Sequence, residues 1–114
     1  MAARPSKTEF NIHVITWNVA SALPLMQDVE SLFMPQESTS LRDVFKKTDI
    51  FVIGLQEAYQ SLQEAMVSSV PVVGRDDIME LFASYLAPKG YVRLTFCRIL
   101  GIVNMVFIRK SLLC

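Results

Sequence analysis

Two polar residues end the two stretches of the chain that are most clearly predicted as strands. Asn18 ends HVITWN, and Glu57 ends IFVIGLQE. If both stretches are strands and lie parallel, these residues meet at the carboxyl edge of one sheet, where open α/β sheets usually bind ligands. A carboxylate there is a natural Mg²⁺ ligand, and an amide can bind a phosphate oxygen or hold a second carboxylate in place. The plainer interpretation is that Glu57 begins a helix and Asn18 caps a loop, and spacing alone leaves both open.

Basic residues are a second source of candidate chemistry, because charge is unevenly distributed. The 11 Lys and Arg balance the 11 Asp and Glu, which argues against a nucleic-acid binder held by bulk charge. Every acid lies at or before Glu80, so residues 81–114 carry only basic charge. This part of the chain either prefers anions or lacks its compensating partner. Its basic residues predict contacts with phosphate or an anionic membrane surface, or else a solvated hairpin face: Arg93, Arg98, Arg109 and Lys110.

Histidine and cysteine chemistry is poorly supported. His13 is the single histidine and falls in mid-strand, which favours a packed structural residue over a catalytic base. Cys97 and Cys114 are too few for a zinc site or a disulfide framework, and reduced cysteines indicate the cytosol. The first ten residues lack the apolar core of a signal peptide, and no apolar run reaches the roughly 20 residues of a membrane span. We therefore expect a cytoplasmic protein that can also lie peripherally on a membrane.

Hydrophobic periodicity predicts the elements that would position these residues. Residues 9–18 and 49–57 are predicted as strands covered on both faces and joined in parallel by a crossover. Residues 20–37 are predicted as loop with at most one helical turn. The remaining predicted elements are a short helix over 41–47, helices over 60–69 and 78–86, and a hairpin of strands 91–97 and 102–109 that turns near Gly101.

This order, β-α-β-α-α-β-β, predicts an α/β domain with helices on at least one face of a sheet. The 114 residues, 52% of them apolar, suffice for one small core. The chain ends just after a hydrophobic strand, which we expect to be an apolar, unprotected edge of the kind that stable domains avoid. We therefore expect this chain to be the opening part of a larger domain.

The two strand ends also carry a family resemblance. FNIHVITWNVASALP followed by TDIFVIGLQEA resembles the start of an inositol polyphosphate 5-phosphatase catalytic domain. LFASYLAPKGYVRLTFCRILGIVNMVFIRK is similar to the next helix and hairpin of that family, so the resemblance covers residues 9–110. TWNVASA is most similar to the kidney- and muscle-enriched branch. The wider endonuclease/exonuclease/phosphatase superfamily also uses an Asn and a Glu at these strand ends.

The resemblance implies a fold and a chemistry. The fold is a four-layer α/β sandwich of two packed sheets, of which residues 9–114 would be the incomplete N-terminal portion after a flexible 1–8. The activity is Mg²⁺-dependent removal of the 5-phosphate from phosphoinositide lipids or soluble inositol polyphosphates, with no nucleic acid partner. Glu57 matches the family's metal-binding Glu, and Asn18 matches the Asn that helps to organise the phosphate and the catalytic centre. Arg93 and Arg98 are weaker candidates for phosphate binding.

The departures from the family pattern are large. The family's catalytic His and its G-D-x-N-x-R, P-A-W-x-D-R and S-D-H segments do not occur in these 114 residues. We therefore expect this chain to be inactive by itself and to need the missing C-terminal half of the domain. Smaller departures are Ala20 and Ala58, where Gly and Val are common, and Leu100, where Gln is common. The alternatives are a non-catalytic interaction or regulatory piece that pairs its hairpin edge with a partner, and another phosphodiesterase or nuclease of the superfamily.

Overall fold

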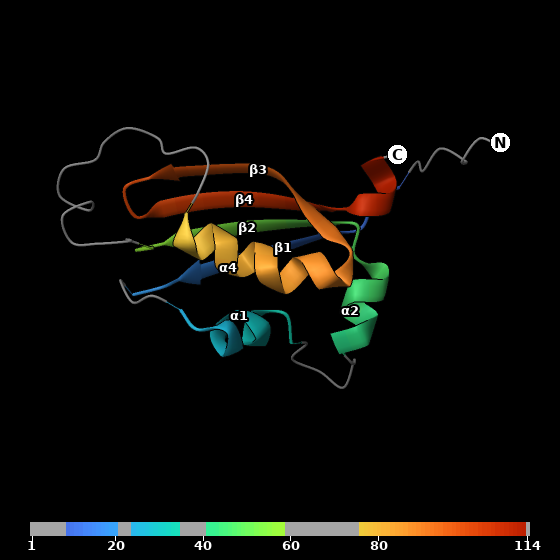
Figure 1. The fold of residues 1–114 in the computed structure, drawn as a ribbon, viewed down its shortest axis with the longest axis horizontal. Helices are drawn as coiled ribbons and strands as arrows, with labels where there is room; N and C mark the ends of the chain where they lie inside the picture. The colour runs from blue at the N-terminus through green and yellow to red at the C-terminus, as the bar shows by residue number, and fades with distance from the viewer. Residues whose placement is uncertain (1–8, 21–23, 35–40, 59–75, 114) are drawn as a thin grey trace, which may run out of the picture.

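The computed structural model describes residues 9–20, 24–34, 41–58 and 76–113 (Figure 1). None of the helices in these ranges is long and apolar enough to cross a bilayer. The predicted helix over 60–69 lies outside the described residues. The elements in chain order are β1 (Ile12–Asn18), α1 (Met26–Leu32), α2 (Leu41–Lys47), β2 (Ile50–Gln56), α4 (Asp77–Leu86), η1 (Ala87–Lys89), β3 (Tyr91–Ile99), β4 (Ile102–Arg109) and η2 (Lys110–Leu113).

The four strands form one mixed sheet in the order β1-β2-β4-β3. β1 and β2 are parallel, as predicted, and β3 and β4 form the predicted antiparallel hairpin. The prediction that the last strand is an exposed edge is wrong, because β4 inserts between β2 and β3 and pairs with both. Central placement satisfies the backbone hydrogen bonds of β4 on both sides and leaves β1 and β3 as the edges of the described sheet.

Helices cover one face of this sheet and build the core there. α4 lies across the sheet with α1 beside it (Figure 1). The inward side chains of the two central strands alternate with outward ones, as the two-residue period of a strand requires. The buried core under the helices includes Phe51, Ile53 and Leu55 of β2, Val103, Met105 and Phe107 of β4, and Ile78, Phe82 and Leu86 of α4.

Helix α1 was not predicted, because 20–37 contains Pro24, Pro35 and scattered polar residues. Two features explain it. The Asp28 carboxylate accepts a hydrogen bond from the backbone N–H of Leu25 at 2.8 Å, which satisfies a donor at the start of the helix. Val29 and Phe33 are buried in the core, so tertiary packing stabilises a helix of only seven residues.

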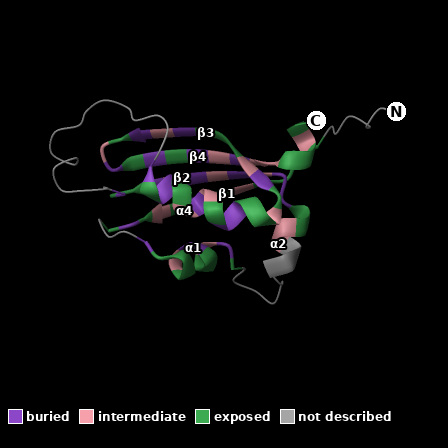
Figure 2. Ribbon diagram, viewed as in Figure 1, coloured by how far each residue is buried: buried purple, intermediate pink, exposed green. Residues whose placement is uncertain are grey.

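The side chains that point away from the helices are less buried than those of the core, and buried residues alternate with more exposed ones along β2 and β4 (Figure 2). Ile12 and Val14 of β1 are 59% and 63% exposed, and Val52 of β2 and Val106 of β4 are half-buried. The prediction that both parallel strands are covered on both faces is therefore wrong for β1. The apolar residues on both sides of this strand indicated double burial, but the described helices lie on one side only.

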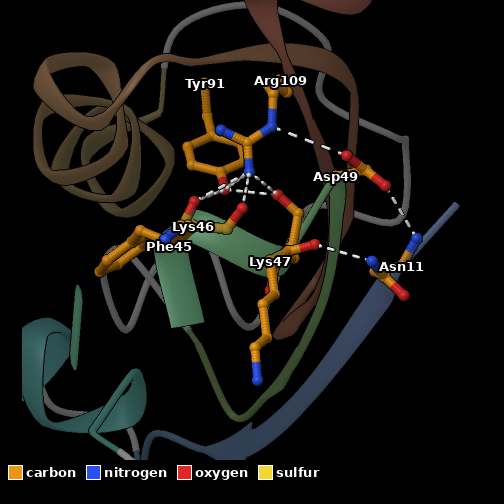
Figure 3. Close-up of polar contacts among 8 residues, drawn as sticks. Asn11, Phe45, Lys46, Lys47, Asp49, Tyr91 and Arg109 are labelled. Carbon is orange, nitrogen blue, oxygen red and sulfur yellow. Dashed lines mark hydrogen bonds and ion pairs between the residues drawn. The ribbon is translucent and has the colours of Figure 1, made fainter. Parts of the chain in front are cut away.

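The edge of the sheet where β1 and β2 begin is fixed by a polar network around the end of α2 (Figure 3). The Arg109 guanidinium donates to the carbonyl of Phe45 at 2.8 Å, and the Tyr91 hydroxyl donates to the carbonyl of Thr48. The Asp49 carboxylate accepts from the backbone N–H of Asn11 at 2.9 Å. The bonds from Arg109 and Tyr91 satisfy carbonyls that the end of a helix leaves free, so Arg109 is a structural residue here.

Candidate active site at the carboxyl edge of the sheet

Asn18 and Glu57 lie at the ends of adjacent parallel strands, as the sequence predicts. Asn18 is the register partner of Gln56, the residue before Glu57. The backbone N–H of Val19 donates to the carbonyl of Gln56 at 2.8 Å, which extends the ladder one step beyond β1. Both Asn18 and Glu57 are exposed. The edge therefore presents the Glu57 carboxylate beside the side-chain amides of Asn18 and Gln56. That the side chains of Asn18 and Glu57 face a single cleft stays a prediction.

Asn18 also caps a local turn. Its side-chain Oδ1 accepts a hydrogen bond from the backbone N–H of Ala20 at 2.9 Å, and Ala20 has a φ of 60°. The loop-capping interpretation of Asn18 is thus correct, but it uses only the oxygen of the amide. Within the described part of the chain, the two N–H donors of this amide make no hydrogen bond, so they can donate to an anion.

Glu57 does not begin a right-handed helix. Its φ is 52°, in the left-handed region that a residue with a Cβ adopts rarely. The peptides on both sides are held, because Gln56 accepts from Val19 and the N–H of Ala58 donates to the carbonyl of Gly101 at 2.8 Å. The backbone of Glu57 is therefore fixed by β1 on one side and by the β3–β4 turn on the other.

Strained backbone is concentrated at this edge. The described non-glycine residues with positive φ are Ala20, Glu57 and Leu100. They follow β1, β2 and β3 respectively, and all three strands point the same way. Each such residue costs on the order of 1–3 kcal/mol and persists only where surrounding contacts hold it, which is typical of functional sites.

Comparison with known proteins gives a consistent family. No family model matches the chain. The chain is 29% identical to mouse inositol polyphosphate 5-phosphatase K over 103 residues and 30% identical to human phosphatidylinositol 4,5-bisphosphate 5-phosphatase A over 103 residues. The structure matches the inositol polyphosphate 5-phosphatase domain of SPSynaptojanin, in complex with inositol (1,4)-bisphosphate and calcium ion, with a TM-score of 0.65 and 27% identity over 91% of this chain.

In sequence and in fold, the chain is similar to part of the inositol polyphosphate 5-phosphatases. It matches only part of these 5-phosphatases: it spans 20% of the mouse protein, 9% of the human protein and 28% of the synaptojanin domain. The predicted fold class is confirmed as a mixed α/β fold that corresponds to part of the 5-phosphatase domain. Membership of the kidney- and muscle-enriched branch stays a prediction.

The donor set at this edge fits a weakly held hard cation. Among the described residues there is no group of three or more His, Cys, Asp or Glu that could enclose a metal ion. The edge offers the exposed carboxylate of Glu57 and, next to it in the chain, the side-chain amide oxygen of the exposed Gln56, whereas the Oδ1 of Asn18 is engaged in the turn with Ala20. Mg²⁺ suits such a set, because it takes oxygen ligands, keeps several waters and commonly uses one or two carboxylates together with substrate phosphates.

The two arginines predicted to bind anions lie elsewhere. Arg98 is 1% exposed and faces the core, where its guanidinium pairs with the buried carboxylate of Asp76. Arg93 is exposed on β3 but is the register partner of Phe107, which in turn pairs with Phe51. Arg93 therefore lies level with Phe51, which is six residues before Glu57. This separation is roughly 20 Å along the strands, at about 3.3 Å per residue. The structure therefore brings neither arginine to the solvent-facing edge beside Asn18.

Asp76 is the residue that sequence reasoning missed. It caps α4, accepting from the backbone N–H of Ile78 at 2.9 Å, and it binds Arg98 at the same time. One signal in the sequence pointed to it: Arg98 is two residues after Phe96, so strand alternation places the two on one face. A guanidinium on an apolar face requires a buried acid.

Proposed function

We propose that this chain provides the Asn18 and Glu57 strands of a divalent-cation-dependent phosphatase domain. The domain would remove the 5-phosphate of inositol polyphosphates, either soluble or as the head groups of phosphoinositide lipids. The observation that carries the proposal is the pairing of Asn18 with Gln56, which brings the amide and the Glu57 carboxylate to one edge. The similarity of the chain to part of the inositol polyphosphate 5-phosphatases supports the substrate class.

The two residues have different chemical roles in this proposal. The Glu57 carboxylate is an oxygen ligand for Mg²⁺, whose charge when bound stabilises the developing charge on phosphoryl oxygens. The side-chain N–H groups of Asn18 donate to a phosphate oxygen while its Oδ1 stays in the turn with Ala20. The turn therefore orients the donor groups before any ligand arrives, and such pre-organisation lowers the cost of binding.

The substrate side of this proposal excludes Arg98. Its guanidinium is committed to Asp76 and to the carbonyls of Ala58 and Leu100, so a phosphate could reach it only by breaking a buried ion pair. Breaking such a pair leaves an uncompensated buried charge. Of the two basic candidates, Arg93 alone is exposed, and it lies near the opposite edge.

A binding experiment on the whole 114-residue chain tests both roles. Amide NMR signals are followed while Mn²⁺ is added as a paramagnetic substitute for Mg²⁺. We expect broadening at Val19, Glu57 and Ala58 in the wild type, and loss of this local broadening in Glu57→Gln. The matched control is Glu80→Gln, which removes an exposed carboxylate from α4 and leaves the edge unchanged. Broadening that is equal in the wild type and Glu57→Gln would contradict the proposed metal role.

The role of Asn18 is tested separately with inositol (1,4)-bisphosphate in the presence of Mg²⁺. Asn18→Asp keeps an oxygen for the turn with Ala20 but has no N–H donor. Asn18→Ala removes both the oxygen and the donors. We expect both variants to lose the ligand-induced shifts at the edge, while Asn18→Asp retains the turn. Ligand shifts that survive in Asn18→Asp and disappear in Asn18→Ala would reduce Asn18 to a turn residue.

A further inference from the structure

The buried pair of Asp76 and Arg98 lies directly behind the candidate site. Asp76 and Arg98 are each 1% exposed and are 22 residues apart in sequence. The contact is bidentate: Arg98 Nε donates to one carboxylate oxygen of Asp76, and Arg98 Nη2 donates to the other at 3.2 Å. Such bidentate pairs are both strong and geometrically specific.

The same guanidinium reaches the backbone next to Glu57. Arg98 Nη1 donates to the carbonyl of Ala58 and, at 2.9 Å, to the carbonyl of Leu100. These two carbonyls flank the bond from Ala58 N–H to the carbonyl of Gly101. Arg98 thus ties the segment after β2 to the β3–β4 turn, while Asp76 fixes the guanidinium and caps α4.

This arrangement accounts for the strained backbone of Glu57. A left-handed residue with a Cβ relaxes unless the peptides on each side are held. The Gln56 carbonyl, in the peptide before Glu57, is held by β1, and the Ala58 N–H, in the peptide after Glu57, is held by the Gly101 carbonyl. Arg98 holds the Ala58 carbonyl, which belongs to the next peptide along the chain, so it fixes the far side of Ala58. Removal of the Arg98 contact would leave the Ala58 side of this arrangement with a single hydrogen bond.

We propose that the Asp76–Arg98 pair is a positioning device that fixes the backbone of Glu57, and with it the direction of the Glu57 carboxylate. The pair acts through Ala58 and touches neither metal nor substrate. The part of this inference that concerns metal affinity rests on the proposed function, whereas the backbone part does not. Outer groups that orient metal ligands typically change metal affinity by about 10–100-fold.

Two variants weaken the pair in different ways. Arg98→Lys keeps a positive charge but replaces the planar fork by one ammonium, which cannot serve Asp76, Ala58 and Leu100 together. Asp76→Asn keeps an oxygen that can cap α4 but removes the carboxylate charge. Arg109→Lys is the matched control, because it removes a guanidinium from the opposite edge that likewise contacts an acid and backbone carbonyls.

The first measurement is amide hydrogen exchange at Ala58, expressed relative to Ile53 in the central strand β2, which reports global unfolding. We expect exchange at Ala58 to accelerate relative to Ile53 by about tenfold in Arg98→Lys and Asp76→Asn, since roughly one hydrogen bond is lost. The second measurement is Mn²⁺ affinity from the broadening at Glu57, which we expect to fall by about tenfold in both variants. In Arg109→Lys, both quantities should match the wild type.

The outcomes separate the two proposals. The positioning role is overturned if, in both variants, amide exchange at Ala58 relative to Ile53 is the same as in the wild type and the Mn²⁺ affinity equals that of Arg109→Lys. If the wild type itself shows no Mn²⁺ broadening at Glu57, the proposed function loses its metal site, and the exchange ratio alone still decides whether the pair fixes the backbone. Accelerated exchange at Ala58 in both variants but not in Arg109→Lys supports the positioning role.

Discussion

Asp49 and Arg109 face each other across the paired strands β2 and β4, with Arg109 Nε 3.6 Å from Asp49 Oδ1. Their backbones are also joined, since the Arg109 N–H donates to the Asp49 carbonyl at 2.8 Å. Together with the Asp76–Arg98 pair, this contact explains why residues 81–114 can carry only basic charge. Acids from the first 80 residues compensate basic groups of the last 34, so the C-terminal part is not simply an anion-binding surface.

Arg109→Lys should lower the free energy of unfolding by about 1–2 kcal/mol, because it removes hydrogen bonds to carbonyls at the end of α2. The positive charge stays, so a loss of this size would show that the fork geometry matters. Urea denaturation measures the change. Lys110→Met, an exposed neighbour, is the control and should lie within about 0.5 kcal/mol of the wild type. Equal stability of Arg109→Lys and the wild type would contradict the capping role.

Tyr85 offers a test at high pH. Burial, with a smaller contribution from Glu30, raises the pKa of Tyr85 from 10.0 to about 12, and its hydroxyl is buried without a hydrogen-bond partner among the described residues. The folded-state pKa exceeds the unfolded one, so the folded state binds more protons above pH 10 and its stability falls from pH 10 through pH 12. Tyr85→Phe should remove this part of the decline and, at pH 7, stabilise the fold by up to about 1 kcal/mol.

Urea denaturation of both proteins between pH 7 and pH 12 provides the comparison. We expect the stability advantage of Tyr85→Phe to grow as the pH rises above 10. The other titrating groups are common to the two proteins, so their contributions cancel in the difference. If the free energies of unfolding of the wild type and Tyr85→Phe differ by the same amount at every pH in this range, Tyr85 titrates alike in the folded and unfolded states.

The open face of the sheet is tested with two valines. Val14→Thr on the exposed side of β1 should change stability by no more than about 0.5 kcal/mol. Val103→Thr, at a fully buried position of β4, should cost at least about 1–3 kcal/mol because it buries a hydroxyl. Thermal or urea denaturation measures both. A cost at Val14 as large as that at Val103 would mean that another surface covers this face in solution.

The 114-residue chain should hydrolyse no 5-phosphorylated inositol above the rate given by Mg²⁺ alone. Phosphate monoester hydrolysis is among the slowest uncatalysed reactions, and enzymes accelerate it by up to roughly 10²¹-fold. The described part offers one carboxylate, Glu57, and two side-chain amides at this edge, and His13 packs in mid-strand with its ring 5.5 Å from that of Phe51. Phosphate release is compared between the wild type and Glu57→Gln; turnover that vanishes in the variant would prove this expectation wrong.

The sequence by itself determined most of the local elements, with the exception of α1, and the strand ends at which Asn18 and Glu57 lie. The apolar runs before Asn18 and Glu57 fixed two strands, and a connection of 30 residues made their parallel pairing predictable. The helix before Pro88 and the hairpin near Gly101 followed equally from short-range patterns. These features depend on periods of two or 3.6 residues and on turn residues, so a single segment contains all the information they need.

Tertiary structure alone decided which strand became central, which face stayed open and what each arginine does. The insertion of β4 beside β2 depends on pairing between segments about 50 residues apart, which no local pattern encodes. Arg93 and Arg98 were both predicted to bind anions, yet one is exposed and the other is buried against Asp76. A charge is stable in a core only when the rest of the fold supplies its partner, so its role is fixed by long-range contacts and not by its neighbours in the chain.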